Sequence, residues 1–179
     1  MYKKSSFWSV LGLIVVLLGC SNDDERPMTA KSSHRYTEAI VVSADLSKDG
    51  AVSAILTDDQ QVAVWDNRSQ KPLAQWHKKQ FDDELFVLAL SGNARFLCVA
   101  GHWTVTMLNV ADGSVVTVWD VQGFSHSATV SALHVDETAS KVLVGMSDGA
   151  VLSVNLKTGN ALKLDHHRLK VTRLSYDVS

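Results

Sequence analysis

The chain contains 179 residues, of which 46% are hydrophobic and 20% are charged, and its formal net charge is −2. This length and composition suit a folded protein with room for one domain. The near-neutral charge argues against a nucleic-acid partner, because nucleic-acid-binding proteins gather Lys and Arg on one face.

Residues 1–19 are predicted to be a lipoprotein signal peptide. Lys3 and Lys4 precede an uncharged, largely apolar run over 7–18, which is shorter than the about 20 residues that a membrane-spanning helix needs. The run ends in Leu17-Leu18-Gly19-Cys20, which resembles the bacterial lipobox, whose cysteine is lipidated and becomes the first residue. A cleaved soluble signal peptide and a short membrane anchor are the alternatives. A cysteine directly after the apolar run favours lipidation of Cys20.

The predicted lipid anchor also indicates where in the cell the protein is located. Acyl chains contribute about 0.8 kcal/mol per buried methylene, so an acylated Cys20 would hold the chain on a membrane. Ser21 follows it, whereas the inner-membrane retention signal of enteric bacteria has Asp at this position. We therefore expect the outer membrane, with the chain facing the periplasm. Residues 20–38 are expected to form the lipidated cysteine and a flexible tether, since they lack apolar periodicity.

A pattern of short strands separated by polar turns begins at residue 39. In its first copy the strand-like segments are 39–46, Ala51–Thr57, Gln61–Asp66 and Lys71–Trp76. Strands of about 5–6 residues with closely spaced turn residues indicate an antiparallel meander. Because residues 39–46 alternate poorly between apolar and polar side chains, we expect that this strand is buried on both faces.

The same layout returns twice more along the chain. Trp65-Asp66 recurs as Leu108-Asn109 and as Val154-Asn155. A period of roughly 40–45 residues with four strands per unit is the spacing of β-propeller blades. The sequence therefore predicts an all-β domain over residues 39–179. Its copies are expected at about 39–80, 85–121 and 126–165, with a partial copy at 167–179.

This region resembles the WD40-repeat β-propeller family. Trp65-Asp66 closes the third strand of the first copy, as the family's signature dipeptide does. His126 and His167 precede two aligned segments at the place where the family carries Gly-His, although both copies lack the glycine. The resemblance implies WD40-like blades in which such a histidine joins a hydrogen-bonded set with a turn aspartate and a strand hydroxyl. Asp59 and Asp148 are the candidate turn aspartates.

The tryptophans divide into a repeated set and one exception. Trp76 and Trp119 occupy one repeat position, and recognition residues would differ between blades. We expect that these two residues, like Trp65 and Asp66, act through stability. Trp103 breaks the pattern. It is the candidate contact with a partner protein if its side chain is exposed, and a partly buried side chain is the alternative.

The sequence carries no catalytic or cofactor-binding pattern. Its seven histidines show no His-x-x-x-His spacing, and its two cysteines form no Cys-x-x-Cys pair. It also lacks a Gly-x-Ser-x-Gly elbow and a Gly-rich phosphate loop. Cys98 lies in an apolar, strand-like segment and is expected in the core. We therefore expect no enzyme activity, no cofactor and no metal site.

Three functions remain open. The first is a membrane-anchored, non-catalytic platform for protein interaction or assembly, with an unknown protein partner. The second is a propeller enzyme or sugar-binding protein with a site on the ring axis. The third is a truncated fragment of a longer propeller, since the repeat region makes roughly 3.2 blades and propellers close with about four to eight. Self-association that completes the ring is the alternative to truncation.

Overall fold

The structure is a computed structural model that describes residues 35–125, 127–137 and 140–175. Everything below concerns these residues. The predicted signal peptide, most of the predicted tether, Cys20 and His126 lie outside them.

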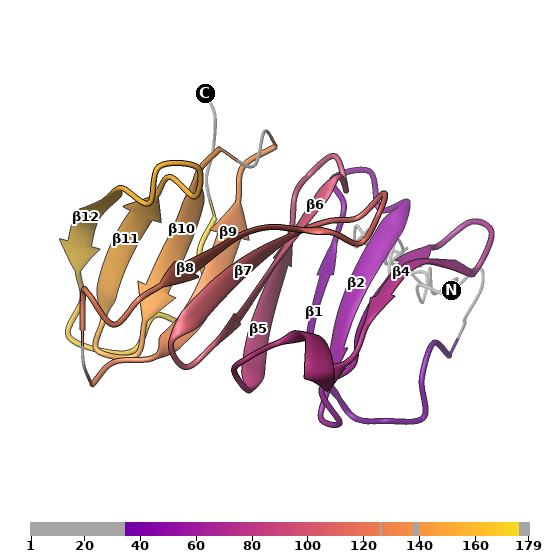
Figure 1. Ribbon diagram of the computed structural model, residues 1–179, viewed down its shortest axis with the longest axis horizontal. Coiled ribbons are helices and arrows are strands. Elements are labelled where there is room, and N and C mark those ends of the chain that lie inside the picture. The colour runs from indigo at the N-terminus through magenta and orange to yellow at the C-terminus, as the bar shows by residue number, and fades with distance from the viewer. Residues whose placement is uncertain (1–34, 126, 138–139, 176–179) are drawn as a thin grey trace, which may run out of the picture. The chain divides into compact units, whose positions relative to one another are not determined.

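The described chain forms three four-stranded antiparallel sheets, here named blades 1 to 3, each built from strands that follow one another in sequence (Figure 1). Blade 1 contains β1 (Val41–Leu46), β2 (Val52–Thr57), β3 (Val62–Asp66) and β4 (Lys71–Trp76). Blade 2 contains β5 (Leu85–Leu90), β6 (Phe96–Gly101), β7 (Thr104–Asn109) and β8 (Val115–Asp120). Blade 3 contains β9 (Val130–Val135), β10 (Val142–Met146), β11 (Ala150–Val154) and β12 (Ala161–His166). A 3-10 turn, η1 (Lys78–Gln80), follows blade 1.

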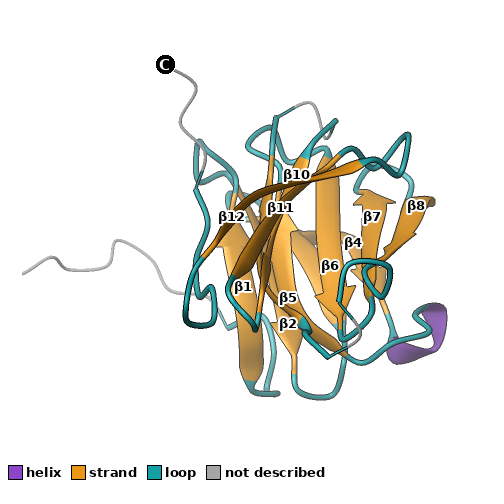
Figure 2. Ribbon diagram, turned by 90° about the vertical axis from the view of Figure 1, so that its left-hand side faces the viewer, coloured by secondary structure: helices purple, strands orange, loops and turns teal. Residues whose placement is uncertain are grey.

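This arrangement confirms the prediction of three four-stranded antiparallel blades. The blades stand side by side in sequence order (Figure 1). The first strands of successive blades are neighbours, because β1 contacts β5 and β5 contacts β9. Figure 2 shows the connecting loops gathered at the two ends of the strands. One of these ends carries the loops that join blade to blade, and we name it the joining end.

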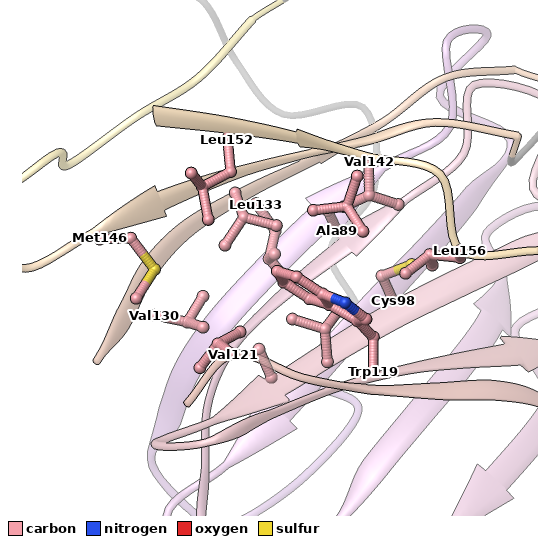
Figure 3. Packing of buried hydrophobic residues seen from close by; sticks show 14 of the residues in the cluster. Ala89, Cys98, Trp119, Val121, Val130, Leu133, Val142, Met146, Leu152 and Leu156 are labelled. Carbon is pink, nitrogen blue, oxygen red and sulfur yellow. The ribbon is translucent and has the colours of Figure 1, made fainter. Parts of the chain in front are cut away.

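Two buried clusters fill the seams between the blades. The first seam, between blades 1 and 2, includes Leu56, Val64, Leu88 and Leu97. The second seam, between blades 2 and 3, includes Cys98, Trp119, Leu133 and Leu152 (Figure 3). Blade 2 lies between both clusters, so its middle strands β6 and β7 are buried along almost their whole length. Stacking of sheet faces thus forms the core, as the apolar runs of the repeat predict.

The expectation that residues 39–46 form a strand buried on both faces is wrong. Four of the six residues of β1 are exposed, and Leu46 has an exposed fraction of 58%. In the described part of the chain, no blade covers the face of blade 1 that points away from blade 2. The poor alternation has another cause, since the pairing of β1 with β2 shifts register between Val41 and Ser43.

Candidate functional site

The position of the signature aspartate has the same role in all three blades. Asp66 Oδ1 accepts hydrogen bonds from the amides of Arg68 and Ser69, at 2.8 and 3.0 Å. These bonds lower the pKa of the Asp66 carboxyl below its ordinary value of 3.8. Asn109 Oδ1 accepts from the Ala111 amide at 3.0 Å, and Asn155 Oδ1 binds the equivalent turn in blade 3. This residue therefore closes the turn between the third and fourth strands.

The repeated tryptophans lie in the seams. Trp76 is 2% exposed, and its Nε1 donates to the Gly113 carbonyl at 2.9 Å, which ties blade 1 to blade 2. Trp119 is 8% exposed and lies in the second seam, with its ring 5.4 Å from that of Phe124. Trp65 is half-buried on blade 1, where its ring lies 4.9 Å from that of Tyr36. All three make contacts that hold the fold.

The structure describes only part of the expected histidine–aspartate set, because His126 lies outside the described residues. Asp59 accepts from the strand hydroxyl of Thr57, and this bond lowers the pKa of its carboxyl. Asp148 accepts from the Ala150 amide at 3.0 Å. His167 is exposed, and its Nε2 lies 3.6 Å from the carboxylate of Asp165 rather than beside Asp148.

The chain segment after blade 3 contacts the turn that follows Asp148. The backbone of His167 passes directly over Gly149, where an added Cβ would overlap the His167 carbonyl. The His167 amide donates to the Gly149 carbonyl at 2.8 Å. Backbone contacts thus hold the blade 3 turn.

Blade 2 contains an acid that the sequence analysis missed. Asp83, in the loop before β5, is 10% exposed in its side chain, and its Oδ2 accepts from the Trp103 amide at 2.6 Å and the Thr104 amide at 3.3 Å. Its Oδ1 lies 3.7 Å from His102 Nδ1. The acid is in the joining loop and the histidine in the turn, the reverse of the arrangement that the resemblance implies. The sequence signal for this Asp83–His102 pair was that His102, a histidine, occupies the repeat position of Asp59.

Trp103 lies in the turn that Asp83 holds. Its side chain is half-buried, and its ring centroid is 6.1 Å from that of His102. The structure therefore fits the partly buried alternative, and the side chain still offers surface at the joining end.

A trough runs along the first strands of the blades. Its volume is about 910 Å³, and it is lined by β1, β5, β9 and the segment 172–175. Much of its polar lining is engaged in holding the fold. Asp45 Oδ2 accepts from the Leu90 amide at 2.8 Å, and Lys48 Nζ lies 3.1 Å from Glu137 Oε1.

The described residues include no group of three or more His, Cys, Asp or Glu side chains that could hold a metal ion. Cys98 is a buried free cysteine, and burial raises the pKa of its thiol. Over the same residues, the structure has no helix with the length and apolar character to span a membrane.

Comparisons with known proteins agree with this architecture. The chain matches no family model. The WD repeat-containing protein SL1-17 of Schistosoma mansoni is 26% identical over 137 residues, which cover 76% of this chain and 44% of that protein. Two solved structures, of U3-55K and of the RRP9 WD40 repeats, each give a TM-score of 0.64 at 13% identity over 78% of this chain. The chain spans 43% and 42% of those two structures, so it corresponds to less than half of each similar protein.

Proposed function

Because this chain is built from WD40-repeat propeller blades, we propose that it is a bacterial lipoprotein that acts as a non-catalytic platform for protein assembly. One observation carries the proposal. Asp66, Asn109 and Asn155 fill one repeat position and all close the same turn. Residues that repeat in this way hold the blades in place. Surface residues that differ between blades are therefore the ones available to recognise a partner.

The platform is anchored by Cys20, which would be acylated after removal of residues 1–19. The apolar run that ends at Cys20 supports this proposal, and Ser21 supports the outer membrane facing the periplasm. The test compares the parent with Cys20→Ser after expression in a Gram-negative bacterium. The parent should fractionate with outer membranes and carry acyl mass on its first residue. A Cys20→Ser chain that is still processed and membrane-bound would refute the anchor.

The platform role is tested by photo-crosslinking in the same cells. A crosslinking residue at Trp103, at the joining end, is compared with one at Lys157, in an exposed turn between β11 and β12. We expect a discrete crosslinked protein from the first position and none from the second. Equal products from both positions, or none from either, would argue against a specific partner at this end.

A second function is favoured by the trough. Its volume of about 910 Å³ lies within the usual range of small-molecule sites, about 300–1,000 Å³, so an axial ligand such as a sugar is the alternative. A screen of sugars by thermal shift tests it, and a shift abolished by Arg173→Ala, a change in the lining, would support it. Self-association that completes a ring is the remaining candidate, and sedimentation velocity of the full chain in detergent tests it.

A further inference from the structure

A small hollow lies at the joining end, next to the trough, with which it shares Val87. Its volume is about 290 Å³, and it is lined by Phe86 of β5, His102 of the β6–β7 turn, Thr129 and Ser131 around the start of β9, and Lys170. This volume is at the lower limit for a drug-sized ligand. The hollow therefore suits a single side chain better than a cofactor.

Lys170 is held at this hollow by its neighbours in the chain. The Val171 amide donates to the Met146 carbonyl at 3.2 Å, and the Ser131 hydroxyl donates to the Val171 carbonyl at 2.7 Å. Val171 is 8% exposed and packs so closely on Gly145 that a Cβ there would overlap its side chain. The backbone that carries the ammonium group is therefore fixed before any ligand arrives.

The charge at the hollow is positive. Among the described residues that line it, Lys170 is the one Lys or Arg and there is no carboxylate. Lys170 is exposed and has no ion pair within the part of the chain that the structure describes. Asp83 lies nearby, but its Oδ2 accepts two backbone amides and its side chain is 10% exposed. Two backbone amides of blade 2 thus bind one oxygen of this carboxylate, and the other oxygen faces His102.

The remaining lining supplies one more donor and an aromatic wall. The Ser131 hydroxyl is already committed to backbone carbonyls, whereas the Thr129 hydroxyl has no partner among the described residues. The ring of His102 meets the Phe86 ring edge-on at 4.4 Å and faces Asp83 with Nδ1. The two rings thus form an aromatic wall beside the hollow. A carboxylate at this point would meet an ammonium and a hydroxyl donor beside an aromatic wall.

We propose that this hollow binds the carboxylate of a Glu or Asp side chain from an acidic segment of the partner protein. The inference rests on the proposed platform function and names the chemistry of its partner. Lys170 pairs with the carboxylate, Thr129 donates a hydrogen bond to it, and Phe86 covers its methylene groups.

The test uses the full chain in a neutral detergent at about 0.15 M salt, where long-range attraction between exposed charges is screened. A fluorescein-labelled hexaglutamate peptide is the probe, and its anisotropy is measured. We expect saturable binding that Lys170→Gln weakens about fivefold or more, because a charge-assisted contact is lost. Thr129→Val should weaken it about threefold. Lys163→Gln is the matched control, since Lys163 is an exposed lysine on β12, and it should leave binding unchanged.

Three results would overturn the proposal: no binding of hexaglutamate, equal losses in the Lys170→Gln and Lys163→Gln chains, or tighter binding of hexalysine. Competition by inorganic phosphate far stronger than competition by acetate would also overturn it, by showing a phosphate site. Failure here is distinguishable from failure of the platform. If Trp103 still crosslinks to a partner while hexaglutamate does not bind, the hollow alone is refuted.

Discussion

The two seams of this molecule join similar blades by different chemistry. The first seam is crossed by several hydrogen bonds from side chains of blade 1. The Leu88 and Leu90 amides donate to Ser43 and Asp45, and the Gln60 side chain makes two bonds with the backbone of Leu85. Polar groups thus fix how β5 lies against blade 1.

The second seam depends mainly on apolar packing, and the Asn93 side chain crosses it at one end by donating to the Glu137 carbonyl at 2.7 Å. Val87 and Ala89 fill the repeat positions of Ser43 and Asp45 there, and both are apolar. Trp119, Leu133, Leu152, Cys98 and Ala89 belong to one buried cluster (Figure 3). The comparison teaches that a propeller repeat specifies strand geometry and turns, while the chemistry between blades is free to change. This freedom explains how degenerate repeats keep one fold.

The largest predicted effect is in the second seam. Trp119→Ala should lower the free energy of unfolding by about 3–5 kcal/mol, because it empties the centre of an apolar cluster. This loss is comparable to the whole stability of a small domain, about 5–15 kcal/mol. Urea unfolding of the full chain, followed by circular dichroism, measures it. Trp103→Ala is the control and should cost less, since Trp103 is half-buried in a turn. A Trp119→Ala chain as stable as the control would mean that packing does not hold this seam.

The next effect is in the first seam. Gln60→Ala removes both bonds to Leu85, which is 2% exposed. Leaving a buried donor and a buried acceptor unpaired costs about 1–2 kcal/mol each, so we expect a loss of about 2–4 kcal/mol in the same assay. Gln61→Ala is the matched control, because Gln61 is exposed and its side chain reaches only Asp59. Equal stabilities of the two variants would show that water replaces the lost bonds.

A smaller effect is expected at the first strand. Asp45→Ala removes the acceptor for the Leu90 amide and should cost about 1–2 kcal/mol. Asp45→Asn keeps an acceptor oxygen and should restore most of the loss. If both variants lose the same amount, the charge of Asp45, and not its hydrogen bond, acts across the seam.

Most of the fold follows from local sequence, and the reasons are physical. Turn residues and strand lengths repeat about every 44 residues, and the predicted segment Lys71–Trp76 matches β4. Exposure of β1 could not be predicted in the same way, because a strand pattern does not say whether another blade covers it.

The candidate site was less predictable, since side-chain partners depend on which loops meet in space. Asp83, for example, meets His102 and the Trp103 amide from a separate loop. The hollow at Lys170 combines β5, a turn of blade 2, the start of β9 and the segment after blade 3. No spacing along the sequence predicts that these four regions lie next to one another.

The smallest effect concerns the turn that all three blades share. Protonation of Asp66 removes the negative charge that its two amide bonds stabilise. Its folded pKa is lowered from 3.8, so its contribution is fully present above the unfolded pKa and is lost as the pH falls through the folded value. Asn fills this position in the other blades. Asp66→Asn should therefore fold like the parent at pH 7.

Below about pH 4 the parent should lose slightly more stability than Asp66→Asn, because Asn cannot be protonated there. Urea unfolding at pH 7 and pH 3 gives the change in the free energy of unfolding for each chain, and the change in the parent is then compared with the change in Asp66→Asn. Asp58→Asn is the control, since among the described residues the Asp58 carboxylate accepts a single amide, that of Ile40 at 3.2 Å. Unfolding of this variant should follow the parent more closely. If Asp66→Asn is already destabilised at pH 7, the turn of blade 1 requires a carboxylate, and the three turns are not equivalent.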